Sequence, residues 1–172
     1  MKPEVGSRHE ESTIDGELTG LDGRLPAGKV YIVASRYHQT ACDSMTLAAI
    51  ESLESAGFES GRVVVARVPG AWELPLAVQA ALDSPGVIGA IAIGVVIRGE
   101  TTHDEHINRA VSLELMRLGT DSAKPVGLAL LTCNTAEQVV ARTGGELGNK
   151  GAEAAEAVVE MLRLVQKINA TR

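Results

Sequence analysis

Polar and titratable side chains gather in residues 97–108, IRGETTHDEHIN, directly after the apolar run 87–96. Three interpretations are open: a metal site, a phosphate-binding turn beside an acid or base, or a solvated loop that caps a helix. His103 and His106 would share one face of a helix, but a zinc site needs three or four ligands and this pair supplies two. No HExxH motif and no distant Cys/His pair completes the set. We therefore expect no metal.

The turn at 99–102, GETT, suits an anion better. It stands between a predicted strand and a predicted helix, where main-chain N–H groups and the helix dipole favour negative charge. The glycine-rich nucleotide-binding motifs are absent, so a nucleotide is not indicated. A threonine cap without a ligand accounts for the turn equally well, and the motif alone leaves both interpretations open. By spacing alone, Glu73 and Arg142 can also be ordinary solvated charges at helix ends.

From Lys29 onward, apolar segments of strand length alternate with amphipathic segments of helical period. The predicted strands cover residues 30–34, 62–68, 87–96 and 125–131. The predicted helices run from about Asp43, as N-cap, to Gly57, over 72–82, from about 104 to 118 with Gly119 as C-cap, over 135–142, and from about 149 to 168. This alternation predicts an α/β fold, a three-layer α/β/α sandwich of flavodoxin-like type with a four-stranded parallel core sheet.

The carboxyl ends of the predicted strands all meet at one edge of such a sheet, and ligands bind outside that edge. The rule brings together the segments 35–38, 69–73, 98–103 and 132–134. These segments hold most of the side chains that could do chemistry, so we expect the functional site there.

The first 28 residues form a predicted arm ahead of a single domain at 29–172. Within the arm, residues 13–18 could be a short strand. Because a lone strand is marginal by itself, we expect it to join the sheet edge of a neighbouring subunit.

Composition narrows the class of protein. The net charge of −6 argues against a nucleic-acid partner, which would require a basic face. No apolar run is long enough to span a bilayer, and the polar first 28 residues lack the apolar segment of a signal peptide. With only Cys42 and Cys133, and no CxxC motif, free thiols in a reducing compartment are expected. We therefore predict a cytoplasmic protein.

Three blocks of sequence, in order and in register, resemble the 6,7-dimethyl-8-ribityllumazine synthase family. The first is 68–75, VPGAWELP, and the second is 94–103, GVVIRGETTH. The third spans 131–138 and continues through Arg142 to GNKG at 148–151. The similarity extends over about residues 13–165.

The resemblance implies a transferase of riboflavin biosynthesis. The family condenses 5-amino-6-(D-ribitylamino)uracil with 3,4-dihydroxy-2-butanone 4-phosphate and releases phosphate and water, without a metal or organic cofactor. His103 matches the catalytic histidine, whose imidazole can exchange protons near neutral pH. Arg142 matches the phosphate-binding arginine, together with donors at Glu100, Thr101 and Thr102.

The resemblance also implies a set of contacts to the pyrimidine and its ribityl chain, with Tyr37 stacking on the heterocycle. The implied set is Tyr37, His38, Ala71, Trp72, Glu73, Val95, Val96, Ile97, Leu128 and Lys150. In this family the pocket lies between adjacent subunits, so Arg142 and Leu128 are expected to reach the pocket of a neighbour. The chain departs from the family pattern at two of these positions. His38 stands where asparagine is frequent, and Leu128 replaces a frequent aromatic residue.

The resemblance further implies self-association. The family forms pentamers, and in some members twelve pentamers close into a 60-subunit icosahedral shell that can enclose riboflavin synthase. The compact turn at 143–149 resembles the shell-forming members. Two rival hypotheses are a non-catalytic module that retains lumazine or flavin and, less favoured, a flavodoxin-like electron carrier.

Overall fold

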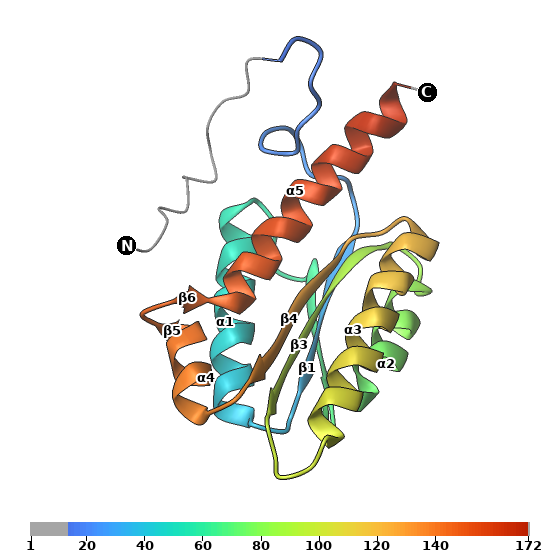
Figure 1. The fold of residues 1–172 in the computed structure, drawn as a ribbon. Helices are drawn as coiled ribbons and strands as arrows, with labels where there is room; N and C mark the ends of the chain where they lie inside the picture. The colour runs from blue at the N-terminus through green and yellow to red at the C-terminus, as the bar shows by residue number, and fades with distance from the viewer. Residues whose placement is uncertain (1–13, 172) are drawn as a thin grey trace.

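The protein is described by a computed structural model over residues 14–171. Four parallel strands form the central sheet in the order β2-β1-β3-β4. They are β1 (Lys29–Ser35), β2 (Val63–Val68), β3 (Val87–Ile97) and β4 (Val126–Cys133). Helices cover both faces of this sheet (Figure 1). The predicted three-layer α/β fold and its four-stranded parallel core are therefore confirmed.

The two outer layers are built from different helix pairs. Helices α1 (Gln39–Ser55) and α5 (Lys150–Ala170) cover one face, and α2 (Leu74–Leu82) and α3 (His103–Ser122) cover the other (Figure 1). Side chains alternate along a strand, so β3 packs against both layers: Ile91 and Ile93 contact the α1 and α5 side, and Ala90 and Ala92 contact the α2 and α3 side. The hydrophobic core is thus divided by the sheet into two clusters.

Shorter elements complete the chain. A 3-10 turn, η1 (Ala71–Glu73), leads from β2 into α2. After β4 come α4 (Ala136–Arg142), with Thr135 as its N-cap, and a small antiparallel hairpin of β5 (Thr143–Gly145) and β6 (Gly148–Asn149). The compact turn predicted at 143–149 is this hairpin. Asn149 then caps α5 by accepting the Gly151 N–H at 2.9 Å.

Two predicted helix ends are wrong. Helix α1 begins at Gln39 rather than after Asp43, because His38 takes the left-handed conformation (φ 55°) and ends the turn after β1. Asp43 instead pairs with Arg67 of β2, at 2.6 Å. Helix α3 continues through Gly119 to Ser122, and its C-cap is Ala123, also left-handed (φ 52°).

The arm shows no strand in its described part. Residues 15–16 form a turn, and the Glu17 N–H donates to the Ile14 carbonyl at 3.2 Å. Thr13 and the residues before it lie outside the described part of the chain. A strand forms only where its backbone hydrogen bonds find a partner. Pairing of this segment with a neighbouring subunit stays a prediction. Further along, Arg163 of α5 donates to the Leu21 carbonyl at 3.3 Å, which ties this segment to the domain.

Candidate active site

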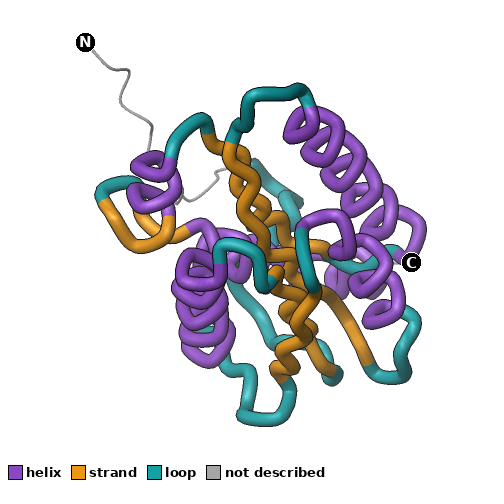
Figure 2. Tube along the Cα trace, turned by 90° about the horizontal axis from the view of Figure 1, so that it is seen from below, coloured by secondary structure: helices purple, strands orange, loops and turns teal. Residues whose placement is uncertain are grey.

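The point where the sheet reverses its strand order defines the site. The chain passes from β1 outward to β2 on one side, whereas β3 lies on the other side of β1. The loops that follow β1 and β3 therefore diverge and leave a crevice at the carboxyl ends of these strands. Figure 2, seen from below Figure 1, looks onto this edge of the sheet. A cavity of about 560 Å³ lies there, lined by Tyr37, His38, Gly70, Ala71, Trp72, Val95, Val96, Ile97, Gly99, Thr101, His103, Asp104 and Ile107.

The turn after β1 contributes two rings. Tyr37 is 67 % exposed, and its ring meets the His38 imidazole edge to face, with centroids 4.7 Å apart. His38 is the N-cap of α1, yet its side chain makes no capping hydrogen bond. Instead its carbonyl accepts the Ala41 and Cys42 N–H groups, each at 3.1 Å. The His38 side chain thus lines the cavity without serving the helix.

The turn after β2 contributes the only tryptophan of the chain. Trp72 sits in η1 with its side chain 62 % exposed at the cavity. Gly70 is extended (φ −151°), and a Cβ there would lie 3.2 Å from the Glu73 carboxylate. Glu73 therefore lies beside the cavity lining and is not part of it.

The segment after β3 brings His103 to the cavity as the first residue of α3. The side chain of Thr102, the N-cap, makes no capping bond, and the His103 N–H reaches Thr101 Oγ1 only at 3.5 Å. Thr102 therefore does not cap α3 with its side chain, and Thr101 makes a long contact to this helix start. The first two residues of α3, His103 and Asp104, line the cavity, and the main-chain N–H groups and dipole at a helix start favour an anion.

Several implied site residues lie outside this cavity in the single chain: Glu73, Glu100, Thr102, Leu128, Arg142 and Lys150. Arg142, at the end of α4, donates to the Gln138 carbonyl at 3.0 Å. Lys150 pairs with Glu153 at 2.7 Å, and Leu128 is 52 % exposed on the edge strand β4. Leu128, Arg142 and Lys150 therefore do not line the cavity of their own chain.

Four lining residues were not among the catalytic, phosphate-binding or pyrimidine-binding residues that the resemblance implies: Gly70, Gly99, Asp104 and Ile107. The two glycines and Asp104 adjoin residues that it does imply. Ile107 could have been found from spacing, because it lies four residues after His103 and so shares its helix face.

The two cysteines are free, as expected, and the structure shows that both are buried and that neither lines the cavity. Burial raises the pKa of the Cys42 thiol to about 11 and also raises the pKa of Cys133. Within residues 14–171, no three His, Cys, Asp or Glu side chains gather in a way that could hold a metal ion. None of the described helices is long and apolar enough to cross a membrane.

Comparison with known proteins gives one family. The family model for 6,7-dimethyl-8-ribityllumazine synthase matches residues 27–166. Proteins of that name from Rhodopirellula baltica and Bdellovibrio bacteriovorus are 56% and 43% identical, covering 88% and 83% of this chain and 97% and 78% of their own lengths. One from Gemmatimonas aurantiaca is 41% identical, covering 81% of this chain and 85% of its own length. The chain therefore belongs to the 6,7-dimethyl-8-ribityllumazine synthase family.

Proposed function

We propose that the cavity between the ends of β1 and β3 is the catalytic site of this protein. As a member of its family, the chain is a transferase of riboflavin biosynthesis that condenses 5-amino-6-(D-ribitylamino)uracil with 3,4-dihydroxy-2-butanone 4-phosphate to 6,7-dimethyl-8-ribityllumazine. The observation that carries the site assignment is that His103 and Tyr37, from separate segments, line one cavity at the switch point of the sheet.

In this proposal His103 moves protons. The pyrimidine amine attacks the ketone carbon, and loss of water leaves an imine. Loss of phosphate and ring closure follow, with release of a second water. Each step transfers a proton at nitrogen, carbon or oxygen, and an imidazole side chain can both accept and return it. His103 is exposed at the cavity, so it can reach the reacting atoms.

The phosphate is proposed to lie at the start of α3. Main-chain N–H groups and hydroxyls at Glu100, Thr101 and Thr102 would hold it there, helped by the helix dipole. The pyrimidine would lie between Tyr37 and the backbone of β3 at Val95, Val96 and Ile97, beside His38, Ala71 and Trp72. Glu73 and Lys150 are proposed for the ribityl chain.

Arg142 and Leu128 are proposed to act on the pocket of a neighbouring subunit. Members of this family are oligomeric, and in the single chain both residues lie outside the cavity. A guanidinium supplied by a neighbour would complete the phosphate site, because its planar fork matches phosphate oxygens. Lys150 also lies outside the cavity of its own chain.

We propose that the assembly is built from pentamers and that twelve of them close into a 60-subunit shell able to enclose riboflavin synthase. The tight hairpin of β5 and β6 supports the shell because it leaves no bulky insertion; Leu147 in its turn donates its N–H to the Ala141 carbonyl of α4 at 2.8 Å. Light scattering of the native protein separates a pentamer from a shell. A cytoplasmic location is proposed because two buried free thiols suit a reducing compartment.

Complementation tests the shared site. His103→Ala should lower kcat by about 10² to 10⁴, and Arg142→Ala should mainly raise the KM for the butanone phosphate. When the two variants are co-expressed and mix at random, about a quarter of the pockets regain both side chains if neighbours share a pocket. No recovery beyond the separate variants would refute the sharing. Tight lumazine binding without product from the unaltered protein would instead indicate a binding module.

A further inference from the structure

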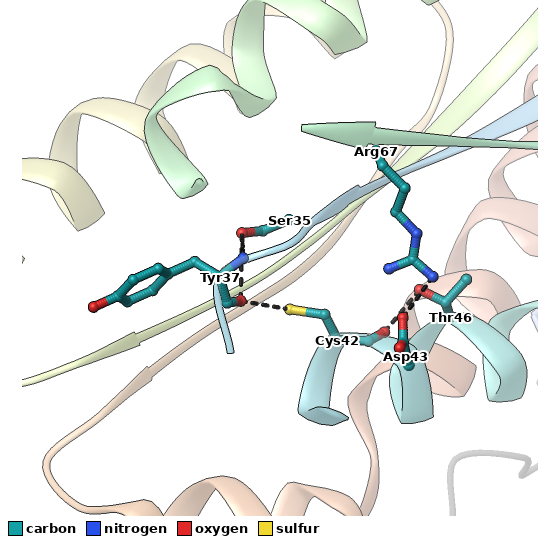
Figure 3. Close-up of polar contacts among 6 residues, drawn as sticks. All are labelled: Ser35, Tyr37, Cys42, Asp43, Thr46 and Arg67. Carbon is teal, nitrogen blue, oxygen red and sulfur yellow. Dashed lines mark hydrogen bonds and ion pairs between the residues drawn. The ribbon is translucent and has the colours of Figure 1, made fainter. Parts of the chain in front are cut away.

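Buried side chains hold both polar groups of the Tyr37 main chain, its N–H and its carbonyl, which are together called the Tyr37 peptide below. Ser35 Oγ accepts the Tyr37 N–H at 3.0 Å and donates to the Tyr37 carbonyl at 3.4 Å. The Cys42 thiol, from the first turn of α1, donates to the same carbonyl at 3.4 Å. Ser35 is 1 % exposed and Cys42 is 0 % exposed. In Figure 3 these bonds join the end of β1 to α1, while the Tyr37 ring points away from the thiol.

This arrangement fixes where two cavity residues project. After the Tyr37 peptide the chain must turn within one residue, and His38 does so in the left-handed conformation, which non-glycine residues adopt at a cost. Such a conformation persists only where surrounding contacts determine it. Here the contacts are the bonds to the Tyr37 peptide on one side and the two N–H groups on the His38 carbonyl on the other.

We propose that Ser35 and Cys42 are positioning residues of the catalytic site. By holding the Tyr37 peptide, they aim the Tyr37 ring and the His38 imidazole into the cavity and so set the affinity for the pyrimidine substrate. This inference rests on the proposed function for the identity of that substrate. Neither residue lines the cavity, so each acts through Tyr37 and His38.

The thiol is suited to this task at physiological pH. Burial raises the pKa of Cys42 to about 11, so its proton remains in place and the side chain stays a donor. A cysteine that merely filled space would be replaceable by alanine with a loss of stability alone. A positioning cysteine should instead be replaceable by serine, which keeps a donor, but not by alanine.

The test compares Ser35→Ala, Cys42→Ala and Cys42→Ser with a matched control, Thr46→Val. Thr46 is 3 % exposed and lies one helical turn after Cys42, where its hydroxyl donates to the Cys42 carbonyl at 2.7 Å without touching the Tyr37 peptide. Each assembled variant is assayed for kcat and KM. The Kd for 5-amino-6-(D-ribitylamino)uracil alone is measured from the fluorescence of Trp72, the only tryptophan and a cavity residue.

Loss of the two Ser35 hydrogen bonds in Ser35→Ala, or of the single Cys42 hydrogen bond in Cys42→Ala, should raise both KM and Kd for the pyrimidine about three- to tenfold, with kcat within about twofold. Cys42→Ser should restore near-normal KM, and Thr46→Val should lower only stability. The proposal is overturned if both alanine variants bind the pyrimidine as the unaltered protein does, or if Thr46→Val changes KM as much as they do. Absence of product from the unaltered protein would refute the proposed function instead, and the Kd comparison would still decide the positioning role.

Discussion

Replacing Gly151 with alanine tests how closely α5 and α1 must approach each other. Gly151 is the second residue of α5 and is buried against α1. A Cβ added there would lie 2.0 Å from the Met45 carbonyl oxygen and 2.6 Å from its carbon. Both are backbone atoms, so no rotamer change can relieve the overlap, and the helices would have to separate by about 1 Å.

Two opposing effects set the expected size of the change. Overpacking a buried contact costs about 1 to 3 kcal/mol, and a backbone overlap belongs at the upper end. Alanine regains up to about 1 kcal/mol of helix propensity over glycine. The net expectation is a decrease of about 2 kcal/mol in the free energy of unfolding.

Chemical denaturation at one fixed protein concentration measures this change, since the stability of an oligomer depends on concentration. Gly119→Ala is the matched control: it is also a glycine within a helix, but its added Cβ would meet no atom closer than 3.4 Å. It should raise stability by about 0.5 to 1 kcal/mol. If Gly151→Ala is as stable as the unaltered protein, the close approach of α1 and α5 does not require glycine at this position.

Three further predictions concern the turn after β1 and the start of α1. Because burial raises the pKa of Cys42 from 9.0 to about 11, the folded state keeps a proton that the unfolded chain loses, so stability should be full below about pH 9 and fall as pH rises to about 11. In Cys42→Ser, the free energy of unfolding should fall less steeply between about pH 9 and pH 11 than in the unaltered protein. An equally steep fall in both proteins would contradict this explanation. His38→Asn should leave the free energy of unfolding nearly unchanged, whereas His38→Val should lower it by about 1 to 2 kcal/mol, since a β-branched residue tolerates the left-handed conformation poorly. Equal denaturation midpoints for the two variants would contradict this explanation. Asp43→Asn removes the partly exposed ion pair with Arg67 and should lower the free energy of unfolding by less than about 1 kcal/mol, with unchanged activity. The decrease should be smaller still in high salt. A change in KM would mean that the ion pair also shapes the site.

The strands and most helices were predictable because their signals are local. Buried strands such as Val87–Ile97 read as continuous apolar runs, and amphipathic helices such as Lys150–Ala170 show their inner face by spacing. Predicted helix ends failed where a single residue outside the usual pattern decided them. His38 and Ala123 are not glycine, so nothing local marks their left-handed backbone.

The sequence by itself determined the fold class, through the alternation of apolar strands and amphipathic helices, and the family, through three blocks in register. The blocks contain His103 and Arg142, and the resemblance that they carry also implied Tyr37, but none of these signals shows which side chains line a cavity within one chain. Only the tertiary structure decided that, because the neighbours of a parallel strand are set by strand order and not by local pattern. The order β2-β1-β3-β4 places Tyr37 and His103 around one cavity and leaves Arg142 beyond it. The tertiary structure also shows that Ser35 and Cys42 bond to the Tyr37 main chain, a contact that depends on how β1 and α1 pack together.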